Sequence, residues 1–93
     1  MDQRERVLRA FVRDGRLVAI PVKAGKRRVV LDEIVQDVEP GLRYPEREVN
    51  ELLSRWYADV AALRRYLVDE CLLSRTPDGV YWRTGGEVDT APA

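Results

Sequence analysis

Residues 45–83, PEREVNELLSRWYADVAALRRYLVDECLLSRTPDGVYWR, contain the pattern that decides the fold. Apolar residues recur at helical spacing in the first part and predict a helix over 45–56, with Pro45 at its first helical position. The same spacing restarts after Asp59, a residue type that caps helices, and predicts a second helix over 59–70. Two helices are therefore expected to meet across a very short connection.

A β-hairpin is predicted at the end of this stretch. Residues 72–75 and 80–83 are short β-prone runs, and residues 76–79 between them, Thr-Pro-Asp-Gly, have the composition of a tight turn. Tyr81 and Trp82 alternate along the second run, so one is expected to face the core and the other to be more exposed. Two helices followed by a hairpin are the pattern of a helix-turn-helix with a wing.

A further helix that fits this pattern is predicted over 27–38, with Gly25 as its N-cap and Pro40-Gly41 at its end. Its apolar face is formed by Val30, Leu31, Ile34, Val35 and Val38. A short strand is predicted over 17–20, and we expect it to pair with the hairpin as a third strand, because an isolated hairpin is only marginally stable. These elements predict an α+β domain with a winged-helix fold and one short extra strand.

An N-terminal helix is predicted over 3–13, with Asp2 as its N-cap and the sequence Asp-Gly after it as a stop. Its outward face carries a basic ridge, because Arg6, Arg9 and Arg13 fall within about 60° of one another on a helical wheel. This helix is an addition to the three helices of the winged-helix pattern.

The length and composition bound the domain count. A mass of 10.7 kDa fits one compact domain, which we expect to comprise residues 1–83. Residues 84–93 carry two glycines, one proline, two acids and an isolated valine, and are expected to form a disordered tail.

Cys71 falls on the same helix face as Leu67 and is expected to be a small buried hydrophobe.

The composition also limits the classes of function. The chain has no histidine, which excludes Ser-His and Cys-His catalysis and histidine-ligated metals. A single cysteine forms no internal disulfide and no multi-thiolate metal site. We therefore expect no enzymatic activity, no cofactor and no metal. The charged N-terminus and the lack of an apolar run of about 18 residues indicate a cytoplasmic protein that does not enter a membrane.

Charge is divided unevenly along the chain. Sixteen Lys and Arg residues balance sixteen Asp and Glu residues, so the formal net charge is zero. Residues 1–28, however, carry nine basic and three acidic side chains, whereas residues 29–93 carry seven basic and thirteen acidic ones. Neutrality therefore excludes a uniformly basic protein, but it does not exclude a basic surface.

Four cations lie immediately before and in the first turn of the helix predicted over 27–38. They are Lys23, Lys26, Arg27 and Arg28. Cations at a helix N-terminus oppose the helix dipole, and a bound phosphate would remove this conflict. The alternative is that these side chains are solvated, with Arg28 pairing with Asp32 one turn further on.

The helix predicted over 59–70 carries two arginines with different expected roles. Arg65 points outward and is a candidate for contact with DNA, because arginine is the commonest reader of guanine in the major groove. Arg64 flanks the core, and we expect it to anchor a carboxylate. The formal charge of this helix is minus one, which is unusual for a helix that inserts into DNA.

Several motifs resemble a bacterial family. They are Gly15-Arg16-Leu17, Ile20-Pro21, Lys26-Arg27-Arg28, Tyr44 to Asn50, Asp59, Leu63 to Asp69 and Tyr81-Trp82-Arg83. Over roughly residues 11–86 the sequence resembles the bacterial domain of unknown function family 2087. The resemblance implies a small stand-alone protein or the C-terminal domain of a transcriptional regulator. Two positions depart from the family pattern, namely Tyr57, where histidine is common, and Cys71, where glycine normally ends the helix.

The leading hypothesis from the sequence is a winged-helix module that binds double-stranded DNA in transcriptional regulation. The candidate nucleic-acid-binding residues are Arg6, Arg9, Arg13, Lys23, Lys26, Arg27, Arg28 and Arg65. The alternative is a protein-interaction module on the same scaffold without direct DNA binding, which forms a homodimer or binds a regulator partner. The charge separation along the chain suits either hypothesis.

Overall fold

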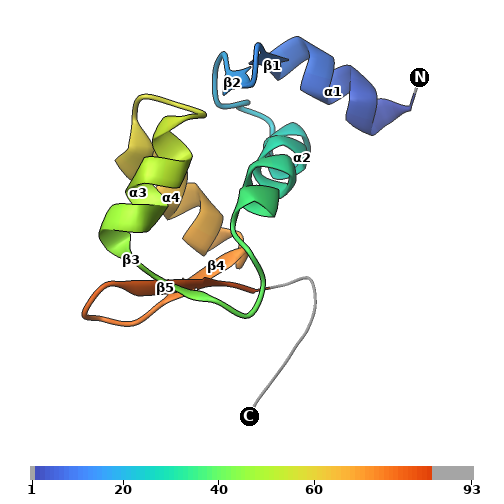
Figure 1. The fold of residues 1–93 in the computed structure, drawn as a ribbon. Helices are drawn as coiled ribbons and strands as arrows, with labels where there is room; N and C mark the ends of the chain where they lie inside the picture. The colour runs from blue at the N-terminus through green and yellow to red at the C-terminus, as the bar shows by residue number, and fades with distance from the viewer. Residues whose placement is uncertain (1, 85–93) are drawn as a thin grey trace.

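Helices form most of the domain, and the strands are short. The computed structural model describes residues 2–84, and within them the chain forms four α-helices, one 3-10 helix and two small antiparallel sheets, a mixed α+β architecture (Figure 1). In chain order the elements are α1 (Gln3–Phe11), β1 (Val12–Arg13), β2 (Arg16–Leu17), α2 (Ala24–Ile34), η1 (Val35–Asp37), β3 (Arg43–Pro45), α3 (Glu46–Ser54), α4 (Val60–Asp69), β4 (Leu73–Arg75) and β5 (Val80–Arg83).

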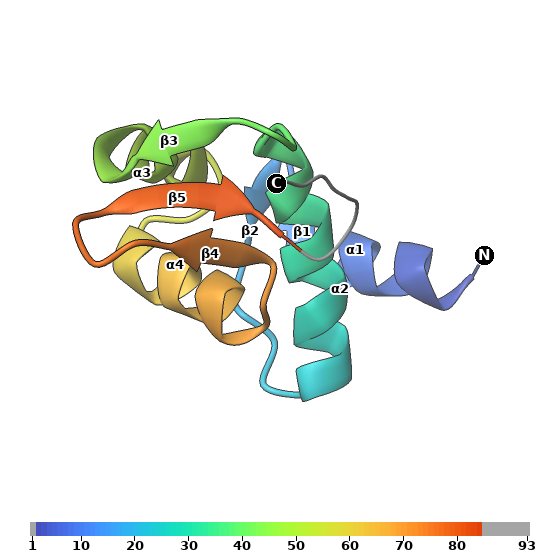
Figure 2. The same cartoon turned by 90° about the horizontal axis from the view of Figure 1, so that it is seen from below.

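The predicted hairpin is confirmed as β4 and β5, and a third strand joins it. The strand order is β3-β5-β4, with Tyr44 of β3 and Arg75 of β4 on either side of Tyr81. Figure 2 shows the three strands side by side, with α3 and α4 behind them and α2 crossing at one end. Tyr81 is buried among the helices, whereas Trp82 points to the other face and is partly exposed.

The prediction that residues 17–20 supply this third strand is wrong. Arg16 and Leu17 pair with Arg13 and Val12 in a separate two-stranded hairpin. Asp14 and Gly15 between them both have positive φ angles, 53° and 75°, as a two-residue hairpin turn requires. The Asp-Gly turn therefore joins β1 to β2, and the strand that pairs with the β4–β5 hairpin is β3 (Arg43–Pro45).

The N-terminal helix is confirmed, with an end two residues earlier than predicted. The Asp2 side chain caps α1 by accepting a hydrogen bond from the Glu5 backbone N–H at 2.8 Å. The Glu5 side chain in turn accepts a hydrogen bond from the Asp2 backbone N–H at 3.3 Å, which completes a capping box. Val12 leaves the helical conformation because it enters β1.

The second helix begins earlier than the sequence indicates. Lys23 is the N-cap of α2, so Gly25 lies inside the first turn and the prediction of a Gly25 cap is wrong. The predicted apolar face is confirmed, because Val30, Leu31, Ile34, Val35 and Val38 are all buried. The α-helix itself ends at Ile34 and continues as the short η1.

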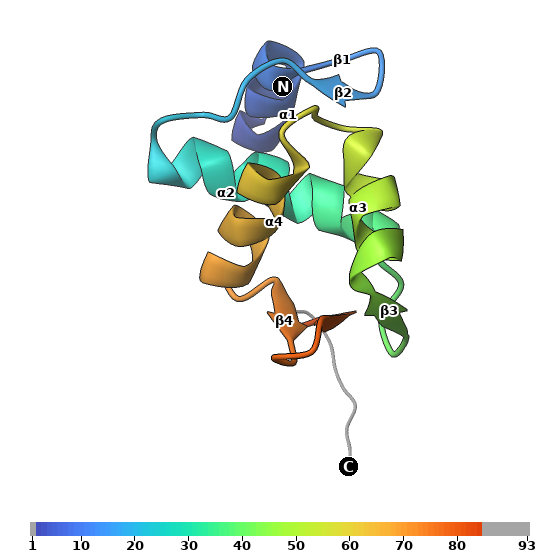
Figure 3. The same ribbon diagram turned by 90° about the vertical axis from the view of Figure 1, so that its left-hand side faces the viewer.

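Helices α3 and α4 meet as expected. Pro45 is the N-cap of α3 rather than its first helical residue, and Asp59 caps α4 through a 3.1 Å hydrogen bond from the Ala62 N–H. Both helices cross α2 on the same side (Figure 3). Leu53 from α3 and Leu63 from α4 are fully buried in the single core that also includes the α2 residues.

Cys71 was predicted to be buried, and that prediction is wrong. It follows the C-cap of α4 with a φ of 62° and is exposed. The N–H of Leu72 donates to the Leu67 carbonyl at 2.9 Å, and the N–H of Cys71 donates to the Val68 carbonyl at 3.0 Å. These two bonds define a Schellman motif, whose left-handed residue turns its side chain away from the core.

Two expectations concern the ends of the chain and the membrane. The tail predicted over 84–93 lies outside the described residues except for Thr84, whose N–H donates to the Leu72 carbonyl at 3.0 Å. Among the helices of residues 2–84, none is long and apolar enough to cross a membrane.

Candidate nucleic-acid interface

The guanidinium of Arg27 makes contacts within the domain. It donates to the carbonyls of Pro21 and Val22, at 3.3 and 2.9 Å. The same group lies 4.9 Å from the centre of the Tyr66 ring on α4. Arg27 therefore fixes the loop before α2 and joins that helix to α4.

Arg28 also makes intramolecular contacts. It donates to the side-chain carboxylate of Glu70 at 3.3 Å and to the Glu70 carbonyl at 3.2 Å. The predicted Arg28–Asp32 pair is wrong, because Asp32 is bound by Arg4 from α1. The contact with Glu70 joins the start of α2 to the end of α4.

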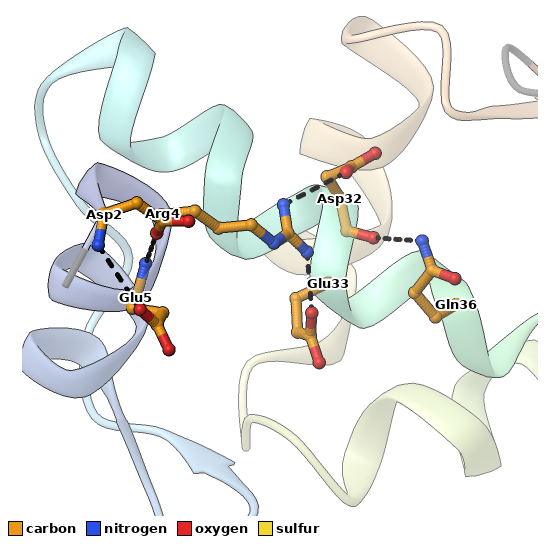
Figure 4. A network of polar contacts seen from close by, with 6 residues as sticks. All are labelled: Asp2, Arg4, Glu5, Asp32, Glu33 and Gln36. Carbon is orange, nitrogen blue, oxygen red and sulfur yellow. Dashed lines mark hydrogen bonds and ion pairs between the residues drawn. The ribbon is translucent and has the colours of Figure 1, made fainter.

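Arg4 spans two neighbouring acids on α2. Its two terminal nitrogens lie 3.3 Å from Asp32 Oδ2 and 2.7 Å from Glu33 Oε1 (Figure 4). All three side chains are about two-fifths exposed, so each pair contributes at most about 1 kcal/mol. The two acids hold α1 against α2.

Six of the eight predicted cations remain free on the surface. They are Arg6, Arg9, Arg13, Lys23, Lys26 and Arg65, all exposed, and the side chain of none has a hydrogen bond or ion pair to another residue of 2–84. Arg6 and Arg9 are exposed on α1 as predicted, but Arg13 lies in β1, so the prediction that all three form a ridge on one helix is wrong. The stretch of four cations around the start of α2 is divided, because Lys23 and Lys26 are free while Arg27 and Arg28 are bound.

The structure brings Arg6 and Lys26 together at a groove between α1 and α2. The groove has a volume of about 320 Å³ and is lined by Gln3, Arg6, Val7, Ala10, Phe11 and Lys26. Its floor is apolar, and its two charged lining residues are both cations. Arg4 contacts Asp32 and Glu33 near the C-terminal end of α2, whereas Lys26 lies in its first turn, and Figure 2 shows that α1 crosses α2.

Arg64 is partly buried and Arg65 is exposed, as expected, but the partner of Arg64 is not the expected one. Arg64 donates to the side-chain oxygen of Asn50 on α3, so the prediction of a carboxylate partner is wrong. Asn50 lies partly buried between α3 and α4. The bond fixes the angle between the two helices.

Several positioning contacts have no signal in the sequence. Arg16 donates to the carbonyls of Ser54 and Arg55, at 3.2 and 3.0 Å, and so caps the C-terminal end of α3. Arg43 stacks 4.4 Å from the Trp82 ring on the outer face of the sheet. These pairs are separated by about 40 residues, and only the tertiary fold brings them together.

Tyr81 and Glu46 form the most buried polar contact of the sheet. The Tyr81 hydroxyl donates to Glu46 Oε1 at 2.9 Å. Burial, together with this hydrogen bond, raises the pKa of Tyr81 above its usual value of 10.0. The contact joins β5 to the first turn of α3.

Within residues 2–84, no three His, Cys, Asp or Glu side chains are grouped so that they could hold a metal ion.

A family model described as "Uncharacterized protein conserved in bacteria (DUF2087)" matches residues 16–83. The chain belongs to the DUF2087 family. The resemblance seen in the sequence is thereby confirmed. A comparison with curated proteins and one with solved structures gave no match.

The family match covers only part of the structure described for this DUF2087 domain. It covers every element from β2 to β5, but α1 and β1 lie outside it. Arg6 and Arg9 of α1 and Arg13 of β1 therefore lie outside the matched range, whereas Lys23, Lys26 and Arg65 lie within it.

Proposed function

We propose that this DUF2087 domain is a winged-helix module that binds double-stranded DNA in transcriptional regulation. The observation that carries the proposal is the connectivity α2-β3-α3-α4-β4-β5 with the strand order β3-β5-β4. In a winged helix, three helices, the last two forming the helix-turn-helix, are followed by a two-stranded wing. On this proposal α4 is the recognition helix, and the β4–β5 hairpin is the wing.

The cations that make no internal contacts are the proposed phosphate-binding groups. Arg65 lies on the exposed side of α4, and Lys23 and Lys26 lie at the start of α2. The contact between Arg27 and Tyr66 holds the start of α2 against α4, so these cations belong to neighbouring surfaces. Arg27 and Arg28 act indirectly, because their guanidinium groups are bound within the domain.

The test is a titration of duplex DNA at several salt concentrations. We expect an affinity that falls steeply with the logarithm of the salt concentration, because binding releases counterions from the phosphates. Arg65→Ala is expected to reduce that slope by about 1, and Lys23→Ala combined with Lys26→Ala by about 2. Arg43→Ala is the matched control, because Arg43 stacks on Trp82 on the sheet face that points away from the helices. Absence of binding at low salt contradicts the proposal.

One observation favours a second candidate, a protein-interaction module without direct DNA binding. Since Arg64 is bound to Asn50, Arg65 is the one exposed cation of α4, and Asp69 is exposed on the same helix. A helix with so little positive charge is poorly suited to the backbone of DNA. If the titration shows no salt-dependent binding, this second function is the one supported by the acids in and beside α4, namely Asp59, Asp69 and Glu70.

A further inference from the structure

The α1–α2 groove combines an apolar floor with cations. Val7, Ala10 and Phe11 form the floor, and Arg6 and Lys26 are the charged residues beside it. Its volume of about 320 Å³ is at the lower end of the range for small-molecule pockets, about 300–1,000 Å³, so it suits one or two protruding side chains. An occupant that fits should present an apolar side chain flanked by acids.

A matching protrusion occurs elsewhere on the same domain, in the turn between η1 and β3. Leu42 is 47% exposed, which makes it one of three large apolar side chains on the described surface with high exposure. Asp37 and Glu39 are exposed within five residues of it. The turn therefore presents one apolar side chain beside two carboxylates, the complement of the groove.

This turn is held in one shape. The Leu42 N–H approaches the Glu39 carbonyl at 3.5 Å, and Gly41 has a φ of 86°, so Glu39-Pro40-Gly41-Leu42 has the features of a type II turn. The Glu39 N–H donates to the Tyr44 hydroxyl at 3.0 Å, and Asp37 accepts a 2.8 Å bond from the Trp56 indole. Little conformational entropy remains to be lost when the turn docks.

The groove and the turn lie at opposite ends of the molecule. In Figure 1 the helix α1 is at the top, and the green segment that leads from α2 to β3 is at the bottom. The longest dimension of the domain is 39 Å. The turn of one molecule therefore cannot fill its own groove, but it can fill the groove of a second copy.

We propose that this domain associates head to tail, with Leu42 of one copy in the α1–α2 groove of the next. Glu39 and Asp37 of the first copy then face Lys26 and Arg6 of the second. The opposite charges of the two surfaces steer the encounter, and the zero net charge of the chain leaves no overall repulsion between copies. A two-fold contact of α1 with α1 is disfavoured, because it places the exposed cations Arg6 and Arg9 of the two copies against each other.

The proposal does not depend on DNA binding, and its contact is small. An interface of one turn and one groove is below the size of a stable protein interface, about 1,200 Å², so the association is expected to be weak and sensitive to salt. Because the contact is heterologous, each assembly keeps a free groove at one end and a free turn at the other, and chains grow as the concentration rises.

Sedimentation velocity of the full chain, without nucleic acid, tests the proposal. At low ionic strength the weight-average mass is expected to rise with protein concentration, and in high salt it returns to the 10.7 kDa of the monomer. Lys26→Glu and Glu39→Lys are each expected to abolish association. Arg13→Glu is the matched control, because Arg13 is an exposed cation of β1 that does not line the groove, and it should leave association within about twofold of wild type.

Mixing the two charge-reversed variants tests whether residues 26 and 39 meet across the contact. Lys26→Glu retains a native turn, and Glu39→Lys retains a native groove. An equimolar mixture is therefore expected to associate again, because the two native surfaces attract each other and the two reversed surfaces are also complementary in charge. Thermal unfolding of each variant confirms that it is folded. A wild-type protein that stays monomeric at low ionic strength, or a mixture that stays monomeric, overturns the proposal.

Discussion

The guanidinium carbon of Arg27 lies 4.9 Å from the centre of the Tyr66 ring, so the first turn of α2 is stacked on α4. Arg27 also donates two hydrogen bonds to the loop before α2. A cation in the first turn of a helix opposes the helix dipole, but here it is held by carbonyl oxygens and an aromatic face. Its role is to fix the position of the proposed recognition helix.

Removal of this side chain should therefore destabilise the domain. Arg27→Ala loses the stacking contact and two hydrogen bonds, and we expect the free energy of unfolding to fall by about 1–2 kcal/mol. Lys26→Ala, the exposed neighbour, should change it little. Urea unfolding of both variants is the measurement, and equal stabilities would show that the Arg27 contacts contribute nothing.

Cys71→Gly should stabilise the domain. A non-glycine residue in the left-handed region costs roughly 1–2 kcal/mol, part of which glycine loses again through its greater freedom in the unfolded chain. We expect a net gain of about 0.5–1 kcal/mol, visible as a rise of a few degrees in Tm. Cys71→Ala is the control, because it removes the thiol but retains the Cβ. A glycine variant no more stable than the alanine variant contradicts this explanation.

The Arg64–Asn50 bond should couple α3 to α4. A double-mutant cycle with Arg64→Ala and Asn50→Ala is expected to give a coupling energy of about 0.5–1.5 kcal/mol, because the bond joins a charged donor to a partly buried amide. Asn50→Asp supplies the carboxylate that the sequence suggested and should retain the coupling. Additive effects of the two alanine substitutions would show that the bond does not hold the helices together.

Tyr81 should make stability depend on pH in alkaline solution. Its pKa is raised in the folded protein, so the folded state binds this proton more tightly than the unfolded state. The stabilisation is complete below the unfolded pKa of 10.0 and is lost as the pH rises through the higher folded value. Tyr81→Phe should flatten the unfolding free energy in this range. An unchanged alkaline dependence in that variant rules out Tyr81 as its source.

Local patterns in the sequence predicted the helices and the wing well. The apolar face from Val30 to Val38 and the caps Asp2 and Asp59 depend on neighbouring residues, and all are confirmed. Strand β3 was missed because Arg43–Pro45 is short and carries no alternating apolar pattern. Its pairing with β5 is a long-range contact that only the assembled helices determine.

The candidate site was harder to predict than the fold. Exposure of Arg6 and Arg9 follows from helical periodicity and could be read from the sequence, whereas Arg13 lies in β1, beyond the end of the helix. The partners of Arg27 and Arg28 could not, since Arg28 meets Glu70 across 42 residues of chain. The groove between α1 and α2 was also missed, because a surface shared by two helices depends on how they pack.

An NMR titration of the domain with a short random-sequence DNA duplex tests the central claim most directly. At low ionic strength we expect the backbone amide signals around Arg65 in α4 and around Lys23 and Lys26 in α2 to shift together, and the shifts to vanish as salt is added. Signals of Arg43 and Trp82 on the outer face of the sheet should stay in place. The absence of any shift at low ionic strength, or shifts confined to Arg43 and Trp82, would contradict the claim that this domain binds DNA through α4 and the start of α2.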